Sequence, residues 1–284
     1  MEKLKAAFYT LGCKVNQYET NGMIQEFMKA GYEIVEFDKV ADVYIVNTCT
    51  VTNMADRKSR QMLRRVKELN PNAILVAVGC YAQVAKEELE KIPEIDLILG
   101  TNEKKNVIDY VERMLDERKA TIKRKIEINR EENSDMNSEE QNLNINNTKQ
   151  AMLKHIDVTD VLHCEEYADF GDVTFTEKTR AVIKVQDGCD RFCSYCIIPF
   201  ARGHIRSRKP ESVVSEITKI AMQGIKEVVI TGIHLASYGR DFKPQQYGLI
   251  DLLEEINKID GIEHIRLRLT RANFNYRRIR WKII

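Results

Sequence analysis

The sequence predicts an α/β protein, with an N-terminal doubly wound parallel sheet followed by the start of a second βαβ array. Two observations support this fold class. Over residues 1–120, short apolar runs alternate with segments whose apolar residues recur at helical spacing. The same alternation resumes near residue 179. Strands that alternate with helices imply parallel βαβ units, so each region is expected to build its own parallel sheet.

In the first region, four apolar runs predict strands that are buried on both faces. They are AAFYTL (6–11), ADVYIVN (41–47), AILVAV (73–78) and IDLIL (95–99). Three helices are predicted between and after them from apolar residues on one face. The residues of those faces are Met23, Ile24, Phe27 and Met28; Met62, Leu63, Val66 and Leu69; and Val107, Ile108, Val111, Met114 and Leu115.

The second region repeats the pattern on a smaller scale. Strands are predicted at TRAVIKVQ (179–186), KEVVITG (226–232) and HIRLRL (264–269). Helices are predicted from about Pro210 to Gln223 and from about Leu249 to Ile259. Three strands are too few to close a barrel, so this array is expected to be incomplete.

A polar segment separates the two regions. Residues 128–150, INREENSDMNSEEQNLNINNTKQ, contain no glycine, proline or aromatic residue and few apolar ones. Such a segment cannot bury enough apolar surface to offset the entropy lost on ordering. We therefore expect a first domain over 1–120, a linker over 121–175 that is largely disordered at 128–150, and a second domain over 176–268.

Composition sets broad limits on function. The chain has 284 residues, 43% hydrophobic and 31% charged, which is enough for two ordinary domains. It contains no run of about 18 apolar residues, and the start MEKLKAAFYT does not resemble a secretory signal, which favours the cytoplasm. With a net charge of only +1, any nucleic-acid binding must come from local basic patches.

Seven cysteines in a chain without a secretion signal favour metal ligands over disulfides. Cys13, Cys49 and Cys80 each follow a predicted strand directly, and two of them stand behind a glycine. The carboxyl ends of parallel strands lie at one edge of a sheet, so these residues are expected to meet there. A single cysteine of this kind is often just a small buried apolar residue, but three at equivalent positions predict a shared metal site. Cys164 fits no such spacing.

Cys189, Cys193 and Cys196 form a C-x3-C-x2-C run. Structural zinc sites usually take four protein ligands, and this run has no nearby fourth cysteine. His204 lies eight residues beyond Cys196. Iron–sulfur cubanes ordinarily take four thiolates, so three would leave one iron open to a small molecule. The strand-end stretch EVVITGIHLASYG could hold such a molecule.

With Tyr195 before its last cysteine, the run resembles the motif of radical S-adenosylmethionine (SAM) enzymes. Together with the N-terminal cysteines, the chain resembles the radical-SAM methylthiotransferases over nearly all of residues 5–115 and 180–268. The stretches TLGCKVNQYET, CDRFCSYCIIPFARG and TGIHLASYG resemble the branch that modifies N6-threonylcarbamoyladenosine in tRNA. Other branches modify isopentenyladenosine in tRNA, or an aspartate of a ribosomal protein.

The resemblance implies a fold, two cofactors and a reaction. The second region would be the first part of a radical-SAM partial (β/α) barrel. Cys189, Cys193 and Cys196 would hold a [4Fe-4S] cluster that cleaves SAM to a 5′-deoxyadenosyl radical, with no catalytic side chain required. Cys13, Cys49 and Cys80 would hold an auxiliary [4Fe-4S] cluster, and a methylthio group would be added to C2 of the adenine at tRNA position 37. Candidate SAM contacts are Tyr195, Thr231, Gly232 and His234.

The resemblance also implies partners: the tRNA anticodon loop, an electron-donating reductase or flavodoxin, a sulfur donor, and no membrane. A single-stranded loop suits proteins that read splayed bases. Candidate phosphate contacts are Arg202, His204, Arg206, Arg208 and Lys209, directly after the second cysteine run. A second basic group, DRKSRQMLRRVK (56–67), could also contact phosphates. For either group alone a solvated face is the simpler interpretation, and the first group is favoured by its position beside the cysteine run.

The end of the chain departs from the family pattern. The codons of Arg268 to Trp281, read one nucleotide later, can encode GSLEPTLITEEFVG, and the family has a segment resembling GSLEP at this point. We therefore expect a frameshift near residue 268, with 269–284 an aberrant tail and the barrel remainder and TRAM domain missing. A chain truncated in this way can keep the sequence motifs of an enzyme and yet be inactive.

Two other function classes are compatible with the cysteine pattern. A non-catalytic iron–sulfur protein would carry electrons or sense redox state without cleaving SAM. A zinc-stabilised binding module would contain zinc and no iron.

Overall fold

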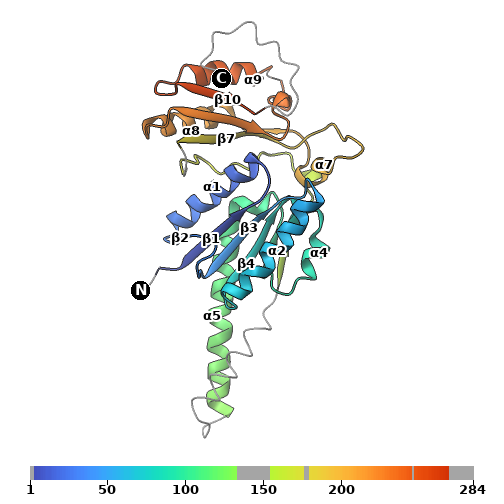
Figure 1. Ribbon diagram of the computed structural model, residues 1–284, viewed down its shortest axis with the longest axis vertical. Coiled ribbons are helices and arrows are strands. Elements are labelled where there is room, and N and C mark those ends of the chain that lie inside the picture. Colours follow the sequence, from blue (N-terminus) through green and yellow to red (C-terminus); the bar gives the residue numbers. More distant parts are fainter. Residues whose placement is uncertain (1–2, 133–153, 176–178, 245, 269–284) are drawn as a thin grey trace.

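The computed structural model describes residues 3–132, 154–175, 179–244 and 246–268. In these ranges the chain forms two sheets that lie on either side of helix α1 (Lys14–Lys29) (Figure 1). No helix in these ranges is both long enough and apolar enough to cross a membrane.

The first sheet has six parallel strands in the order β2-β1-β3-β4-β5-β6. Their bounds are β1 (Lys5–Thr10), β2 (Glu33–Val35), β3 (Val43–Thr48), β4 (Ile74–Gly79), β5 (Leu97–Leu99) and β6 (His155–Asp157). Every residue of β3 and β4 is buried. This confirms the expectation that the central strands are covered on both faces.

Helices cover the two faces of this sheet. Helix α1 and helix α5 (Val107–Glu132), which follows the short turn η1 (Glu103–Asn106), bury Met23, Phe27 and Val111 against one face. The other face is covered by α2 (Asn53–Leu69), α3 (Cys80–Val84) and α4 (Lys86–Glu90). The doubly wound α/β arrangement predicted from the sequence is confirmed.

The region expected to be a linker contains regular structure at both of its ends. Helix α5 continues to Glu132, and β6 pairs with β5 in the register Leu97↔His155. All three residues of β6 are exposed, so its place in the sheet depends on backbone pairing and not on an apolar pattern. The turn η2 (Val161–His163) follows. Residues 133–150 of the predicted disordered segment lie outside the described residues.

The second sheet has the order β10-β9-β7-β8. Its strands are β7 (Arg180–Asp187), β8 (Arg206–Ser207), β9 (Glu227–Gly232) and β10 (His264–Leu267), with β8 antiparallel to β7 and the others parallel. Helices α8 (Pro210–Met222) and α9 (Leu249–Asn257) bury one face. The arrangement fits the first part of a (β/α) barrel. The tail predicted to be aberrant, 269–284, lies outside the described residues.

Strand β7 has two different buried faces. Ile183 and Val185 belong to the apolar core shared with α8 and α9. Lys184, which alternates with them, is also buried, and its ammonium bonds to Glu19 on α1. Helix α1, which lies between the two sheets (Figure 1), thus packs on the first sheet with apolar residues and on β7 with polar ones.

Candidate metal centres

The first cysteine set consists of Cys13, Cys49 and Cys80. Cys13 lies at the N-terminal end of α1 beyond β1, Cys49 follows β3, and Cys80 begins α3 directly after β4. Because β1, β3 and β4 are neighbouring parallel strands, their carboxyl ends meet at one edge of the sheet. The topology therefore brings the three residues to the same edge of the sheet, and a metal site shared by them stays a prediction.

Two glycines allow the backbone at these cysteines to come close. Gly12 has φ +95°, and a Cβ there would lie 2.5 Å from Cys49 Sγ. Gly79 has φ +105°, and a Cβ there would lie 2.5 Å from the carbonyl oxygen of Thr48. Any larger residue would be strained at both positions and would force the strand ends apart.

The thiols of the first cysteine set influence one another. Cys49 and Cys80 are buried and Cys13 is half-buried, and none forms a disulfide. Burial, followed by the charges of Cys80 and Cys13, raises the pKa of the Cys49 thiol. A bound cation would remove this mutual repulsion, because a coordinating thiol is deprotonated outright. This set of sulfur donors therefore suits a metal.

The second cysteine set, Cys189, Cys193 and Cys196, occupies the loop between β7 and the short helix α7 (Ile198–Arg202). All three side chains are half-buried and face a cavity of about 170 Å³. The backbone N–H of Cys189 donates to the carbonyl of Gly203 (2.9 Å), and that of Cys196 to the carbonyl of Cys193 (2.9 Å). These two backbone hydrogen bonds shape the loop so that its three thiols border the cavity.

The two cysteine sets lie near each other. Helix α7 begins two residues after Cys196 and contacts α3, which begins at Cys80. Arg202, the last residue of α7, donates from Nε to Cys80 Sγ at 3.1 Å.

No three His, Cys, Asp or Glu side chains converge around a single point in the described ranges, as they would around one metal ion. A [4Fe-4S] cubane makes a different demand, because it binds each thiolate at a separate iron corner. The sulfur-only donor sets fit such a group, and nitrogen or oxygen ligands are not needed for the fit.

Two of the predicted SAM contacts, Tyr195 and His234, line the cavity beside the second cysteine set. Tyr195 is 81% exposed. His234 is buried, and burial together with the charges of Arg191 and Arg240 lowers its pKa, which favours the neutral imidazole. Thr231 and Gly232 end β9 three and two residues before His234, and they stay predictions for SAM binding.

Sequence reasoning missed Gln186, which joins the two strand ends at this site. Its amide donates to the carbonyls of Asp187 and Gly188 (2.8 Å for Gly188), and its oxygen accepts from the backbone N–H of His234 (2.7 Å). Gln186 therefore fixes the turn before Cys189 relative to the turn after β9. The available signal was its place as the last residue of the predicted strand TRAVIKVQ, three residues before Cys189.

The structure corrects the predicted RNA contacts at three positions. Arg202, Arg206 and Arg208 are 0%, 2% and 0% exposed. Their guanidiniums bond inside the protein, so they cannot reach a phosphate in this structure. His204 and Lys209 are exposed, although His204 already binds Asp190 at 2.7 Å.

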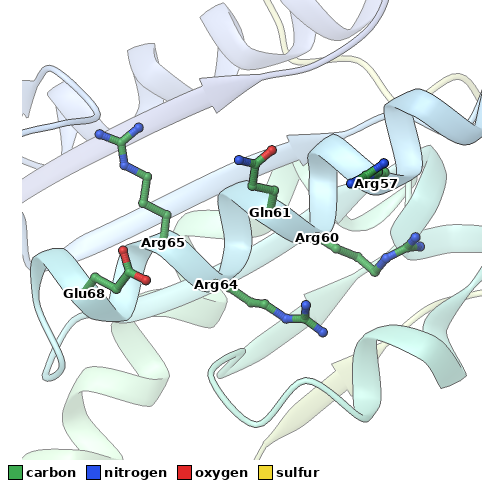
Figure 2. A pocket seen from close by; sticks show the side chains of 6 residues that line it. All are labelled: Arg57, Arg60, Gln61, Arg64, Arg65 and Glu68. Atoms are coloured by element: carbon green, nitrogen blue, oxygen red, sulfur yellow. The ribbon is translucent and has the colours of Figure 1, made fainter.

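The basic face of α2 is more accessible. A groove of about 610 Å³ is lined by four arginines and two other residues from successive turns of this helix (Figure 2): Arg57, Arg60, Gln61, Arg64, Arg65 and Glu68. Arg60 bonds Tyr81 and lies 3.4 Å from Glu88. Arg57, Arg64 and Arg65 are exposed and form no ion pair with any described residue. The α2 arginine face is defined here as Arg57, Arg64 and Arg65.

Comparison with known proteins follows the division into two sheets. Residues 5–100 match the model of uncharacterized protein family UPF0004, and residues 183–280 match that of the radical SAM superfamily. The threonylcarbamoyladenosine tRNA methylthiotransferase MtaB of Bacillus subtilis is 38% identical over 268 residues, which cover 94% of this chain and 51% of that protein.

Relatives named for other activities are somewhat less similar. The ribosomal protein uS12 methylthiotransferase RimO of Clostridium botulinum is 34% identical over 271 residues, covering 94% of this chain and 52% of that protein. The tRNA-2-methylthio-N(6)-dimethylallyladenosine synthase of Bacillus licheniformis is 32% identical over 257 residues, covering 88% and 43%. The chain thus spans about half the length of the curated relatives it matches.

Proposed function

We propose that this chain, which belongs to the radical-SAM methylthiotransferases, adds a methylthio group to C2 of N6-threonylcarbamoyladenosine at tRNA position 37. The observation that carries the proposal is the proximity of two cysteine sets, each of three thiols, one on each sheet. The threonylcarbamoyladenosine branch is favoured because the Bacillus subtilis relative named for that nucleoside is 38% identical, against 34% and 32% for the two relatives named for other substrates.

Each cysteine set would hold one [4Fe-4S] cluster, with an iron left open in each. Bound at the second set, the cluster and SAM supply radical chemistry that can remove a hydrogen atom from a carbon no protein base can deprotonate. The first set would hold the auxiliary cluster, which would supply the methylthio group. The strand ends, the two glycines and Gln186 then serve to hold the thiols of both sets in place.

The residues around the second cysteine set would orient SAM. His234 presents a neutral imidazole and Tyr195 an exposed ring to the cavity. Thr231 and Gly232, at the end of β9, would face the amino acid part of SAM. No acid or base is assigned a proton transfer, because the chemistry belongs to the cofactors.

For the tRNA, phosphate contacts are proposed on the α2 arginine face, together with exposed Lys209 and His204. Helix α2 begins four residues after Cys49, so its first turns lie close to the first cysteine set. Other expected partners are an electron-donating reductase or flavodoxin and a sulfur donor, and action on tRNA would place the protein in the cytoplasm.

The test is anaerobic reconstitution with iron and sulfide, followed by incubation with SAM, dithionite and tRNA that carries N6-threonylcarbamoyladenosine without a methylthio group. Parallel reactions offer tRNA that carries dimethylallyladenosine, or ribosomal protein uS12. We expect 5′-deoxyadenosine and 2-methylthio-N6-threonylcarbamoyladenosine by mass spectrometry, and neither product from a Cys193→Ala control. Clusters without SAM cleavage would instead indicate an electron carrier. Methylthiolation only of dimethylallyladenosine, or only of ribosomal protein uS12, would assign the chain to another branch.

A further inference from the structure

Arg202 connects the two halves of the molecule at a sulfur ligand. It is fully buried at the C-terminal end of α7, six residues after Cys196. Its Nε–H donates to Cys80 Sγ at 3.1 Å. A side chain from the helix that follows the second cysteine loop therefore contacts the sulfur of a residue in the first cysteine set.

The rest of the guanidinium is held by three partners. Nη1 binds the Glu19 carboxylate and lies 3.3 Å from Asp187 Oδ2. Nη2 binds Glu19 Oε2 at 3.1 Å and the side-chain oxygen of Asn16. Because the guanidinium is planar and its other donors are fixed, the direction of the Nε–H toward Cys80 is fixed as well.

The charge of Arg202 is secured by the same contacts. Burial opposes the charged form, but the charges of Cys80, Glu19 and Asp187 outweigh it and hold the pKa of Arg202 well above its usual value. The guanidinium is thus a permanent cation that donates a hydrogen bond to one sulfur.

We propose that Arg202 is a positioning residue that raises the reduction potential of the cluster held by Cys13, Cys49 and Cys80. This inference rests on the proposed function. Reduction adds one electron, and hence one negative charge, to the cluster and its thiolates. A cation that donates a hydrogen bond to a ligating sulfur stabilises the reduced form more than the oxidised form. Arg202 itself gains and loses no proton, and the electron comes from the external donor.

The same contact makes the reduction potential of the first cluster depend on how the second sheet packs against the first. Arg202 is carried by α7, whereas Cys80 belongs to α3 of the first sheet. If the second cysteine loop moved away from α3, the first cluster would lose its hydrogen bond. The auxiliary cluster would then be easier to reduce only while the two halves are docked.

The test measures the midpoint potential of the first cluster alone. Replacing Cys189, Cys193 and Cys196 by Ala leaves one cluster, which is titrated with dithionite and followed by electron paramagnetic resonance. In this background we expect Arg202→Gln to lower the reduced-to-oxidised ratio at a fixed potential about tenfold, a shift of about 59 mV to more negative values. Arg202→Lys keeps the positive charge and should shift the midpoint potential by less.

Arg208→Lys is the matched control. Arg208 is equally buried and also binds α1, through the hydroxyl of Tyr18 (2.9 Å). Its carboxylate partners are Asp169 (3.0 Å) and Glu216 (2.7 Å), and among the described residues it bonds to no cysteine. Its replacement should loosen the same interface without moving the potential. An assembled cluster whose potential is unchanged in both Arg202 variants would overturn the inference.

A measurement on the native side chain covers the case in which Arg202 variants do not fold. Protein with intact Arg202 is labelled with ¹⁵N-arginine, and the reduced first cluster is examined for ¹⁵N hyperfine coupling. We expect a coupled ¹⁵N, and its absence would overturn the inference while the proposed function stands. If Cys13, Cys49 and Cys80 assemble no cluster, the proposed function fails and the inference fails with it.

Discussion

The ammonium of Lys184 lies 2.8 Å from Oε1 of Glu19, and both side chains are 1% exposed. This ion pair joins β7 of the second sheet to α1 of the first. It belongs to a buried charge network that we define as Glu19, Asp187, Lys104, Lys184 and Arg202. Three cations face two carboxylates in this network, so one positive charge is left over beside Cys80. A negatively charged sulfur ligand would balance it.

Glu19 is the centre of this network, and its removal should be costly. Glu19→Gln leaves Lys104, Lys184 and Arg202 with one carboxylate among them. We expect a loss of about 3–5 kcal/mol in the free energy of unfolding of the metal-free chain, measured in urea at pH 7.

The control for Glu19 is Glu26, which forms an exposed ion pair with Lys29 on the same helix. Glu26→Gln should change the free energy of unfolding by less than about 1 kcal/mol. If the two variants were equally stable, the network would not hold the sheets together.

Acid should weaken the same network. Although burial opposes this, Lys184 and Arg202 lower the pKa of Asp187 from 3.8 to about 2. A carboxyl with a lowered native pKa contributes stability above its unfolded pKa and loses it as the pH falls through the native value. Between about pH 4 and pH 2, Asp187 should account for about 2 kcal/mol of lost stability.

Acid titration of the free energy of unfolding tests this for Asp187→Asn. The variant should be less stable at neutral pH, and its stability should fall less steeply below pH 4 than that of the native chain. If the free energy of unfolding fell with pH equally steeply in the variant and in the native chain, the native pKa of Asp187 would not be lowered.

SAM affinity should depend on His234. Its imidazole lines the cavity of the second cysteine set, and Gln186 fixes its backbone. We expect His234→Ala to weaken SAM binding to the reconstituted protein about tenfold, the loss of one well-made hydrogen bond. Equilibrium dialysis with labelled SAM measures this. His163→Ala is the control, because His163 is exposed beside Asp160. Equal SAM affinities in the two variants would show that His234 does not contact SAM.

RNA affinity should depend on the α2 arginine face. Replacing Arg57, Arg64 and Arg65 by Glu should weaken binding of an anticodon stem-loop at least about tenfold. It should also reduce the slope of log K against log salt by about 2, because three phosphate contacts are lost. Lys119→Glu on α5 changes an equally exposed cation and should leave the slope unchanged. An unaltered slope in the triple variant would exclude this face.

Local patterns were enough to predict the main strands and helices. The runs at 43–46 and 73–78 are apolar throughout because β3 and β4 are covered on both faces. The first cysteine set was predictable for a related reason: parallel strands place their carboxyl ends together whatever the intervening sequence is. Strands β2 and β6, three residues each, carry no such pattern because they are exposed or half-buried edge strands.

The basic residues after the second cysteine set were misread for lack of a local signal. In sequence, Arg202 and Arg208 belong to a basic run, which is usually exposed. Glu19, the main partner of Arg202, lies 183 residues away, and Tyr18, a partner of Arg208, lies 190 residues away. Only the packing of α1 between the two sheets brings these groups together.

The most direct test of the account is a count of clusters with ⁵⁷Fe Mössbauer spectroscopy on anaerobically reconstituted protein. The native chain should contain about eight irons as two [4Fe-4S] clusters. Cys49→Ala and Cys193→Ala should each lose one cluster, Cys164→Ala should lose none, and added SAM should alter only the spectrum of the cluster that Cys193→Ala removes. Zinc in place of iron, or a single cluster in the native chain, would contradict the central claim that two sets of three cysteines each hold an open cluster.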